Sequence, residues 1–269
     1  MRWDQFVDEI IDLGTEKVHL YHHLKGFPES CAVLEVSREE VRNAIDTETA
    51  MALHRALDEL DAMPFVRTIF ITGRGDKAFV SGGDLREYSV QLDSTEKVRT
   101  ALGVMRQALW RIYSNSRFAV AIINGPARGG GAELAFSCHY RIMSDHASIG
   151  FVQVTQGIPP GWGGGRLLAD QVGKGKAKLA LMSGSIFDAV DALSMGFVDE
   201  VMHSDEEMIN QMKKVADRFS RTTSTGMAAI HSLLSNANQI LLQQMELESE
   251  HCVELWFDPA HKAILTKYS

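Results

Sequence analysis

Two glycine-rich turns contain the residues best suited to chemistry. Residues 78–85 read AFVSGGDL, and residues 124–134 read NGPARGGGAEL. Each turn follows an apolar run and is expected to open a helix, so that backbone N–H groups stay unpaired and point outward. Because glycine has no Cβ, a ligand atom can approach these donors closely. If the two turns converge, they form an oxyanion hole, which stabilises negative charge on a carbonyl oxygen.

Charged side chains lie close to both turns. Glu133 follows Gly130 by three residues and falls in the first turn of the second predicted helix. Its carboxylate either interacts with the helix dipole or reaches a ligand held by the glycines. Asp84 occupies the position of a helix cap at the first turn, and Arg128 either faces solvent or attracts a substrate carboxylate. Glu133 is therefore the candidate catalytic carboxyl group.

The motifs of several other enzyme classes are absent from the sequence. It contains no GxGxxG after the first predicted strand, no GxxxxGK[ST] and no GxSxG, which disfavours dinucleotide-binding, P-loop and Ser-His-Asp hydrolase functions. Its three cysteines, Cys31, Cys138 and Cys252, are odd in number and far apart, so reduced thiols are expected. The adjacent His22 and His23 have no third ligand at metal spacing. We therefore expect no metal site.

Alternating strands and helices must position the two turns. Apolar runs predict strands at residues 31–36, 66–71, 118–123, 140–143 and 149–154. One helical pattern begins after a cap at Asp46 or Thr47, and a second one spans residues 95–114. This alternation indicates an α/β fold. From about residue 204 the pattern is helical, so we expect a core of residues 1–203 and a helical region of residues 204–269 for subunit contacts or a lid.

Composition limits the classes of partner. The 269 residues are 45% hydrophobic, which suits one large domain with a sizeable core. A net charge of −8 argues against binding to nucleic acid or to an anionic membrane surface. The sequence has no secretory signal pattern and no apolar run of about 18 residues. We therefore expect a cytoplasmic protein with no nucleic-acid or membrane partner.

Taken in order over residues 31–202, these motifs resemble the crotonase, or enoyl-CoA hydratase/isomerase, superfamily. The resemblance implies that the N–H groups of Gly83 and Gly130 are the two oxyanion donors and that Glu133 is the first catalytic glutamate. It further implies a ββα spiral core, a homotrimer or dimer of trimers, an acyl-CoA thioester as substrate, and no metal or redox cofactor. The substrate contacts that it implies are Arg42, Asn43, Ala44, Ala78, Val80, Ser81, Asp84 and Trp162.

One position departs from the pattern of the family's hydratases. Their second catalytic glutamate corresponds to Gln153, four residues before Gly157. Glutamine forms hydrogen bonds but cannot shuttle a proton at neutral pH, which disfavours hydration and double-bond isomerisation. Residues 148–167, with Gly-Trp-Gly-Gly after the proline turn, are more similar to the ethylmalonyl/methylmalonyl-CoA decarboxylase branch. In this segment Trp162 is either a pocket wall or ordinary packing.

The sequence therefore favours decarboxylation of a malonyl-type CoA thioester. Carbon dioxide leaves, and its electrons form an enolate that the oxyanion hole stabilises. A neutral Gln153 avoids repelling the substrate carboxylate, while that carboxylate raises the pKa of Glu133 and lets it donate a proton. Two alternatives remain open: an enoyl-CoA hydratase or isomerase, and a catalytically silent acyl-CoA binding protein.

Overall fold

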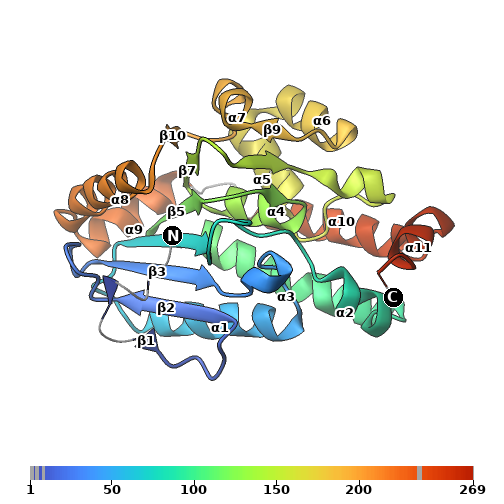
Figure 1. Cartoon of the computed structure of the whole chain (residues 1–269), viewed down its shortest axis with the longest axis horizontal. Helices are drawn as coiled ribbons and strands as arrows, with labels where there is room; N and C mark the ends of the chain where they lie inside the picture. Colours follow the sequence, from blue (N-terminus) through green and yellow to red (C-terminus); the bar gives the residue numbers. More distant parts are fainter. Residues whose placement is uncertain (1–2, 4–5, 8–9, 235–237, 269) are drawn as a thin grey trace.

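The computed structural model describes residues 3, 6–7, 10–234 and 238–268. A twisted sheet of seven strands runs through its centre in the order β1-β2-β3-β4-β5-β7-β10 (Figure 1). The two edge pairs β1–β2 and β2–β3 are antiparallel, and the other pairs are parallel. These strands are β1 (Ile10–Ile11), β2 (Val18–His22), β3 (Cys31–Val36), β4 (Thr68–Gly73), β5 (Phe118–Ile123), β7 (Tyr140–Ser144) and β10 (Glu200–Met202).

A smaller sheet and a set of helices complete the fold, and together they confirm the expected α/β class. The small sheet has the order β6-β8-β9, with β6 (Ala127–Arg128), β8 (Ser148–Gly150) and β9 (Phe187–Asp188). The helices of the first 200 residues are η2 (Glu39–Val41), α1 (Thr47–Asp61), α2 (Leu85–Gln91), α3 (Thr95–Tyr113), α4 (Gly130–Ser137), η3 (Val152–Gln156), α5 (Gly164–Val172), α6 (Lys174–Ser183) and α7 (Ala189–Met195), where η denotes a 3-10 helix.

Local signals explain where the main elements begin. Every residue of β3 and β4 is buried, as expected of mainly apolar strands that are covered on both faces. Asp46 caps α1 by accepting a hydrogen bond of 2.8 Å from the Thr49 N–H, and Ser94 caps α3. The predicted strand over residues 149–154 is wrong in its second half. There the chain leaves β8 at Gly150 and forms η3, which ends at Gly157 in a left-handed conformation (φ 79°).

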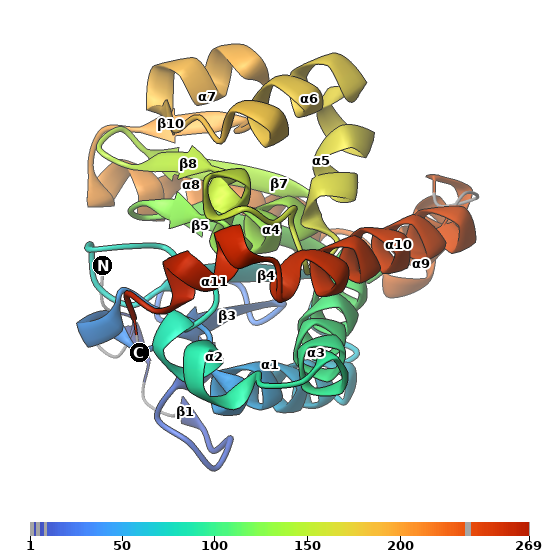
Figure 2. The ribbon, with the colours of Figure 1, turned by 90° about the vertical axis from the view of Figure 1, so that its right-hand side faces the viewer.

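The C-terminal helices pack onto the core and reach the side of the molecule that carries α2. They are α8 (Asp205–Ser220), α9 (Ser224–Leu234), α10 (Asn238–Trp256) and α11 (Pro259–Leu265). Figure 2 shows α10 passing beside α3 and α5 and continuing into α11 above α2. The expected boundary at residues 203/204 falls between β10 and α8, whose N-cap is Ser204.

Two further observations concern the described residues. Cys31, Cys138 and Cys252 are all free and buried, and burial raises the pKa of the Cys31 thiol to about 12. Within the described ranges, no helix has the combined length and apolar character needed to cross a membrane.

Candidate active site

The two glycine-rich turns lie side by side. A bridge joins Val80 to Ala127, and the Arg128 N–H donates to the Val80 carbonyl oxygen at 3.1 Å. A Cβ added to Gly82 would lie 3.4 Å from the Gly130 nitrogen, so the glycines of one turn contact those of the other. The structure therefore brings together the two segments that sequence analysis singled out.

The N–H groups of Gly83 and Gly130 are not used by the backbone ladder that surrounds them. On either side of Gly83, the Gly82 carbonyl oxygen accepts from Ile45 N–H and the Asp84 N–H donates to Ile45 carbonyl oxygen, each at 2.8 Å. The Gly83 N–H takes no part in this bridge. Gly130 is the first residue of α4, so its N–H has no acceptor within the helix. Two backbone donors are thus available to an oxygen atom bound between the turns.

An inner pocket opens at this junction and has a volume of about 70 Å³. Both turns contribute to its lining, together with η3, the turn before α5, and side chains of α2, α3 and α10. Its lining includes Ser81, Gly83, Gly130, Glu133, Gln153 and Trp162, six of the predicted site residues.

Glu133 is buried in this pocket, with 1% of its surface exposed. Its Oε2 accepts hydrogen bonds from the N–H groups of Trp162 (2.9 Å) and Gly164 (2.8 Å), and Gly161 N–H donates to Oε1 at 3.3 Å. Burial raises the pKa of Glu133 to about 7, although these N–H donors partly offset the effect. The carboxyl group can therefore exchange a proton near neutral pH.

Gln153 faces the same carboxyl group. Its Nε2 donates to Glu133 Oε1 at 2.8 Å, while its own Oε1 is buried and has no protein partner. Gln153 lies in η3 rather than in a strand, and this helical turn directs its side chain toward α4. The amide thus holds Glu133 and leaves one acceptor open to the pocket.

Glu248 is a second carboxyl group that sequence analysis missed. It lies on α10, and its Oε1 accepts from the N–H of Gly165 at 3.1 Å, one residue beyond the N–H that binds Glu133. The Glu133 carboxylate and burial of its own carboxyl group raise the pKa of Glu248 well above its ordinary value, with burial the larger cause. Two carboxyl groups therefore share the N-terminus of α5, whose N–H groups and dipole favour negative charge. No local pattern marks Glu248, because it lies more than 100 residues from Glu133 in the chain.

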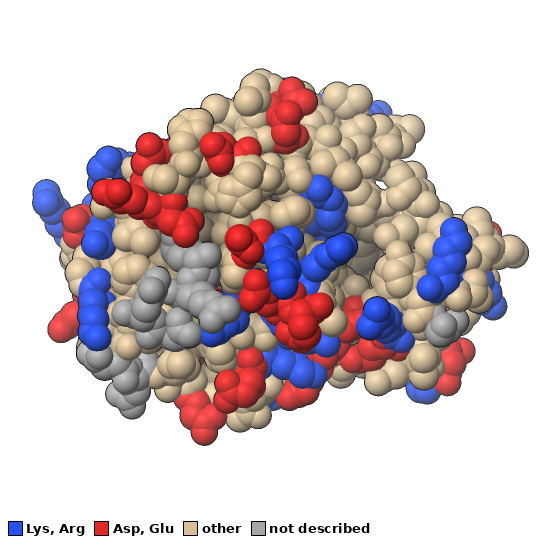
Figure 3. All heavy atoms as spheres, viewed as in Figure 1, with Lys and Arg blue, Asp and Glu red and all other residues tan. Residues whose placement is uncertain are grey.

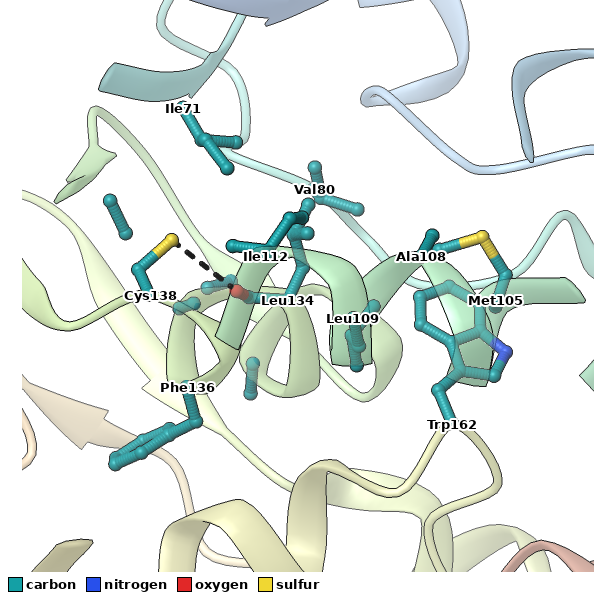
Figure 4. Packing of buried hydrophobic residues seen from close by; sticks show 14 of the residues in the cluster. Ile71, Val80, Met105, Ala108, Leu109, Ile112, Leu134, Phe136, Cys138 and Trp162 are labelled. Carbon is teal, nitrogen blue, oxygen red and sulfur yellow. Dashed lines mark hydrogen bonds between the residues drawn. The ribbon is translucent and has the colours of Figure 1, made fainter. Parts of the chain in front are cut away.

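Trp162 covers Gly130. A Cβ on Gly130 would lie 2.3 Å from Trp162 Cζ3, so only glycine fits beneath the indole ring. Figure 4 shows Trp162 beside Met105, Ala108 and Leu109 of α3, within the large apolar cluster of the core. Sequence analysis left open whether Trp162 is a pocket wall or ordinary packing. In the structure it is both, because it lines the inner pocket and packs against α3.

A wider outer cleft of about 980 Å³ adjoins the inner pocket, and Ser81 and Gly83 line both. Of the predicted contacts, Arg42, Ala44, Ala78, Ser81 and Asp84 line this cleft, and Lys77, Arg86 and Arg128 add positive charge. Figure 3 shows a hollow on this face of the molecule with Lys and Arg side chains near its edge. Cationic side chains and open volume are suited to binding a phosphorylated group.

Two predicted contact residues, Asn43 and Val80, line neither the inner pocket nor the outer cleft, and two residues that do line the cleft, Asp84 and Arg128, also bond within the protein. Asn43 is fully buried, and its Nδ2 donates to the carbonyl oxygens of Arg74 and Ala78, so its side chain fixes the loop. Val80 is fully buried as well and contributes its backbone to the bridge between the turns. Asp84 is the N-cap of α2 and pairs with Arg38 at 3.0 Å. Arg128 is neither free in solvent nor in the inner pocket, because its guanidinium donates to Ser148 carbonyl oxygen and Oγ.

A metal site requires several ligating side chains arranged around one point. Across the residues that the structure describes, no group of three or more His, Cys, Asp or Glu side chains is arranged to hold a metal ion. The chemistry available to the described site is that of two backbone donors, a protonatable carboxyl group and an amide.

Comparison with known proteins gives a consistent result. The family model for enoyl-CoA hydratase/isomerase matches residues 26–263. A crotonyl-CoA hydratase of Syntrophomonas wolfei is 34% identical over 212 residues, covering 78% of this chain and 79% of the relative. An ethylmalonyl-CoA decarboxylase of Mus musculus is 28% identical over 240 residues, covering 87% and 73%. The crystal structure of an enoyl-CoA hydratase from Bacillus halodurans shares the fold, with a TM-score of 0.86 at 24% identity over 93% of this chain and 99% of that one.

Proposed function

The chain belongs to the enoyl-CoA hydratase/isomerase family, and we propose that within this family it decarboxylates a malonyl-type CoA thioester such as methylmalonyl- or ethylmalonyl-CoA. The thioester and its acyl group occupy the inner pocket, and the CoA moiety occupies the outer cleft. Arg42, Lys77, Arg86 and Arg128 line that cleft and supply cations for the CoA phosphates.

One observation carries this proposal: the neighbour of Glu133 in the inner pocket is the neutral amide of Gln153. A substrate that brings its own carboxylate would be repelled by a second glutamate at this place. Two like charges about 4 Å apart repel by on the order of 4 kcal/mol at an effective dielectric constant near 20. The Gln153 amide removes that repulsion and still positions Glu133 through its hydrogen bond of 2.8 Å.

The first chemical step requires no general base. The bond between the α-carbon and the substrate carboxylate breaks, carbon dioxide leaves, and the electron pair forms an enolate on the thioester. The Gly83 and Gly130 N–H groups donate to the enolate oxygen, where negative charge develops. Each such donor lowers the barrier by about 3 kcal/mol when its geometry is set in advance.

The second step requires one proton on the α-carbon. Glu133, with a pKa of about 7, holds a proton in a useful fraction of molecules at neutral pH. It transfers this proton to the enolate carbon, and the resulting carboxylate is stabilised by the N–H groups of Gly161, Trp162 and Gly164. Solvent then returns the proton to Glu133.

Hydration of a short-chain enoyl-CoA is the second candidate function. Its support is the 34% identity to a crotonyl-CoA hydratase. In this reaction Glu133, as the carboxylate, would activate the water molecule, with the same two N–H groups on the thioester oxygen. The decarboxylase proposal ranks first because hydration uses paired acid and base groups across the double bond, and the partner that Glu133 has in the inner pocket is an amide.

A substrate comparison tests the proposal. Purified protein is mixed separately with methylmalonyl-CoA, ethylmalonyl-CoA and crotonyl-CoA, while carbon dioxide release and loss of the enoyl absorbance are followed. We expect carbon dioxide from at least one malonyl-type thioester and slow or no hydration of crotonyl-CoA. Rapid hydration without carbon dioxide release would replace the proposal with the second candidate. Binding of all three thioesters by calorimetry without any turnover would instead indicate a silent acyl-CoA binding protein.

A further inference from the structure

Trp256, the last residue of α10, separates the inner pocket from a second cavity. This flank cavity has a volume of about 340 Å³ and lies between α2 and α11. Its lining combines the apolar side chains of Leu92, Phe257 and Leu265 with the polar ones of Ser89, Asp93, Lys262 and Thr266. Among the described residues, Trp256 alone lines both the inner pocket and the flank cavity. Its indole ring is therefore the wall between a small space and a larger one.

The surrounding residues hold this wall firmly in place. Trp256 is only 3% exposed, and its ring lies edge-to-face against His261 of α11 at 4.8 Å and beside Tyr88 at 5.9 Å. His261 Nδ1 donates to the Gln156 carbonyl oxygen at 2.8 Å, which fastens α11 to η3. Figure 2 shows α11 lying across α2 after the turn from α10. The indole is thus packed between His261 of α11 and Tyr88 of α2.

The volumes of the two cavities indicate how Trp256 can affect the length of acyl group that binds. The inner pocket has a volume of about 70 Å³, whereas the flank cavity has a volume of about 340 Å³. We propose that Trp256 is the specificity-determining residue that restricts this protein to short acyl groups, by closing the inner pocket against the flank cavity. This inference rests on the proposed binding of acyl-CoA in the inner pocket, but not on which reaction follows.

Replacing the indole should join the two cavities and extend the range of acyl chains. Each methylene group that enters apolar space tightens binding about fourfold. For Trp256→Ala we therefore expect octanoyl-CoA to bind at least tenfold more tightly than to the unmodified protein, while the affinity for propionyl-CoA changes less than threefold. Trp256→Leu retains part of the apolar bulk and should give an intermediate gain.

The experiment measures binding of saturated acyl-CoA thioesters of two to ten carbons by calorimetry, because these compounds are not substrates of either candidate reaction. Ser89→Phe, added to Trp256→Ala, refills the flank cavity from α2 and should cancel the gain for octanoyl-CoA. Trp110→Ala removes a tryptophan from α3 that lines neither cavity and serves as the matched control.

The outcomes separate this inference from the proposed function. If no acyl-CoA binds to the unmodified protein, the proposed function fails. If short acyl-CoA thioesters bind but the chain-length profile is the same in Trp256→Ala, Trp256→Leu and the unmodified protein, the role of Trp256 is overturned. The same conclusion follows if Ser89→Phe does not reverse a gain that Trp256→Ala produces.

Discussion

Gln153 Nε2 donates a hydrogen bond of 2.8 Å to Glu133 Oε1, and through this bond the Gln153 amide holds the candidate catalytic carboxyl group of the inner pocket. This bond uses one N–H of the amide, whereas Gln153 Oε1 has no protein partner. The pair therefore presents one proton-carrying group and one neutral acceptor to a ligand.

Gln153→Glu converts this pair into two acids. We expect decarboxylation of the best malonyl-type thioester to fall roughly tenfold or more, since a tenfold change needs only about 1.4 kcal/mol of added repulsion. Some hydration of crotonyl-CoA should appear. Steady-state rates of both reactions measure the effect, and Gln243→Glu, the same change at an exposed position of α10, is the control. An unchanged decarboxylation rate would show that charge at position 153 is irrelevant.

Glu133→Gln removes the group that protonates the enolate. We expect kcat to fall by about 100- to 10,000-fold, the usual contribution of a positioned acid or base, with a small change in KM. Glu246→Gln, an exposed position on α10, should leave kcat unchanged. Near-normal turnover in Glu133→Gln would assign proton transfer to another group.

The pH dependence distinguishes the two candidate reactions. Decarboxylation uses protonated Glu133, so its kcat/KM should fall as pH rises through the Glu133 pKa of about 7. Hydration would use the Glu133 carboxylate, and its kcat/KM should rise through the same range. Profiles from pH 5.5 to 9 measure this directly, and a limb that survives in Glu133→Gln belongs to a different group.

Gly130→Ala tests the oxyanion donor at the start of α4. The new Cβ would lie 2.3 Å from the Trp162 ring, so the turn and the indole must move apart, which displaces the N–H or the wall of the inner pocket. We expect a loss in kcat of about 100-fold or more, comparable to removing an oxyanion donor. Gly103→Ala, at a helical position of α3 where an added Cβ meets nothing within 4 Å, is the control. That control should retain activity and gain about 0.5–1 kcal/mol in the free energy of unfolding.

Glu248→Gln should change stability in a pH-dependent way. The folded state raises the Glu248 pKa, so it binds the proton more tightly than the unfolded chain does. That contribution to stability is present at low pH and is lost as pH rises through the raised pKa. The Tm of the unmodified protein should therefore fall between pH 5 and pH 9 more steeply than the Tm of Glu248→Gln. Equal slopes in Glu248→Gln and the unmodified protein would contradict the raised pKa of Glu248, and Glu246→Gln should retain the original slope.

Much of the fold could be predicted because its signals are local. The apolar run 31–36 is β3, the run 118–123 is β5, and Asp46 caps α1. Such elements follow from the side chains and hydrogen-bonding groups of adjacent residues. The error at residues 152–154 arose because an apolar pattern of this length also fits a helical turn, which the left-handed Gly157 ends.

In the candidate site, too, the residues that could be predicted are those that belong to local motifs. Glu133, Gly83, Gly130 and Gln153 were recognisable because each belongs to a short motif, and the structure places all four on the inner pocket. Their catalytic roles stay predictions. Asn43 belonged to such a motif too, but its burial beneath the loop depends on the Arg74 and Ala78 carbonyl oxygens from a later segment.

The sequence by itself determined the α/β class, the two glycine turns and the acid that follows the second. Only the tertiary structure decided that Glu248 joins Glu133 at the N-terminus of α5 and that Trp256 lines the inner pocket. Both residues come from α10, more than 80 residues after α5 begins, where no periodicity or motif links them to the site. Contacts between such distant segments form when helices pack on one another, and that packing depends on apolar surfaces spread over the whole chain rather than on neighbouring residues.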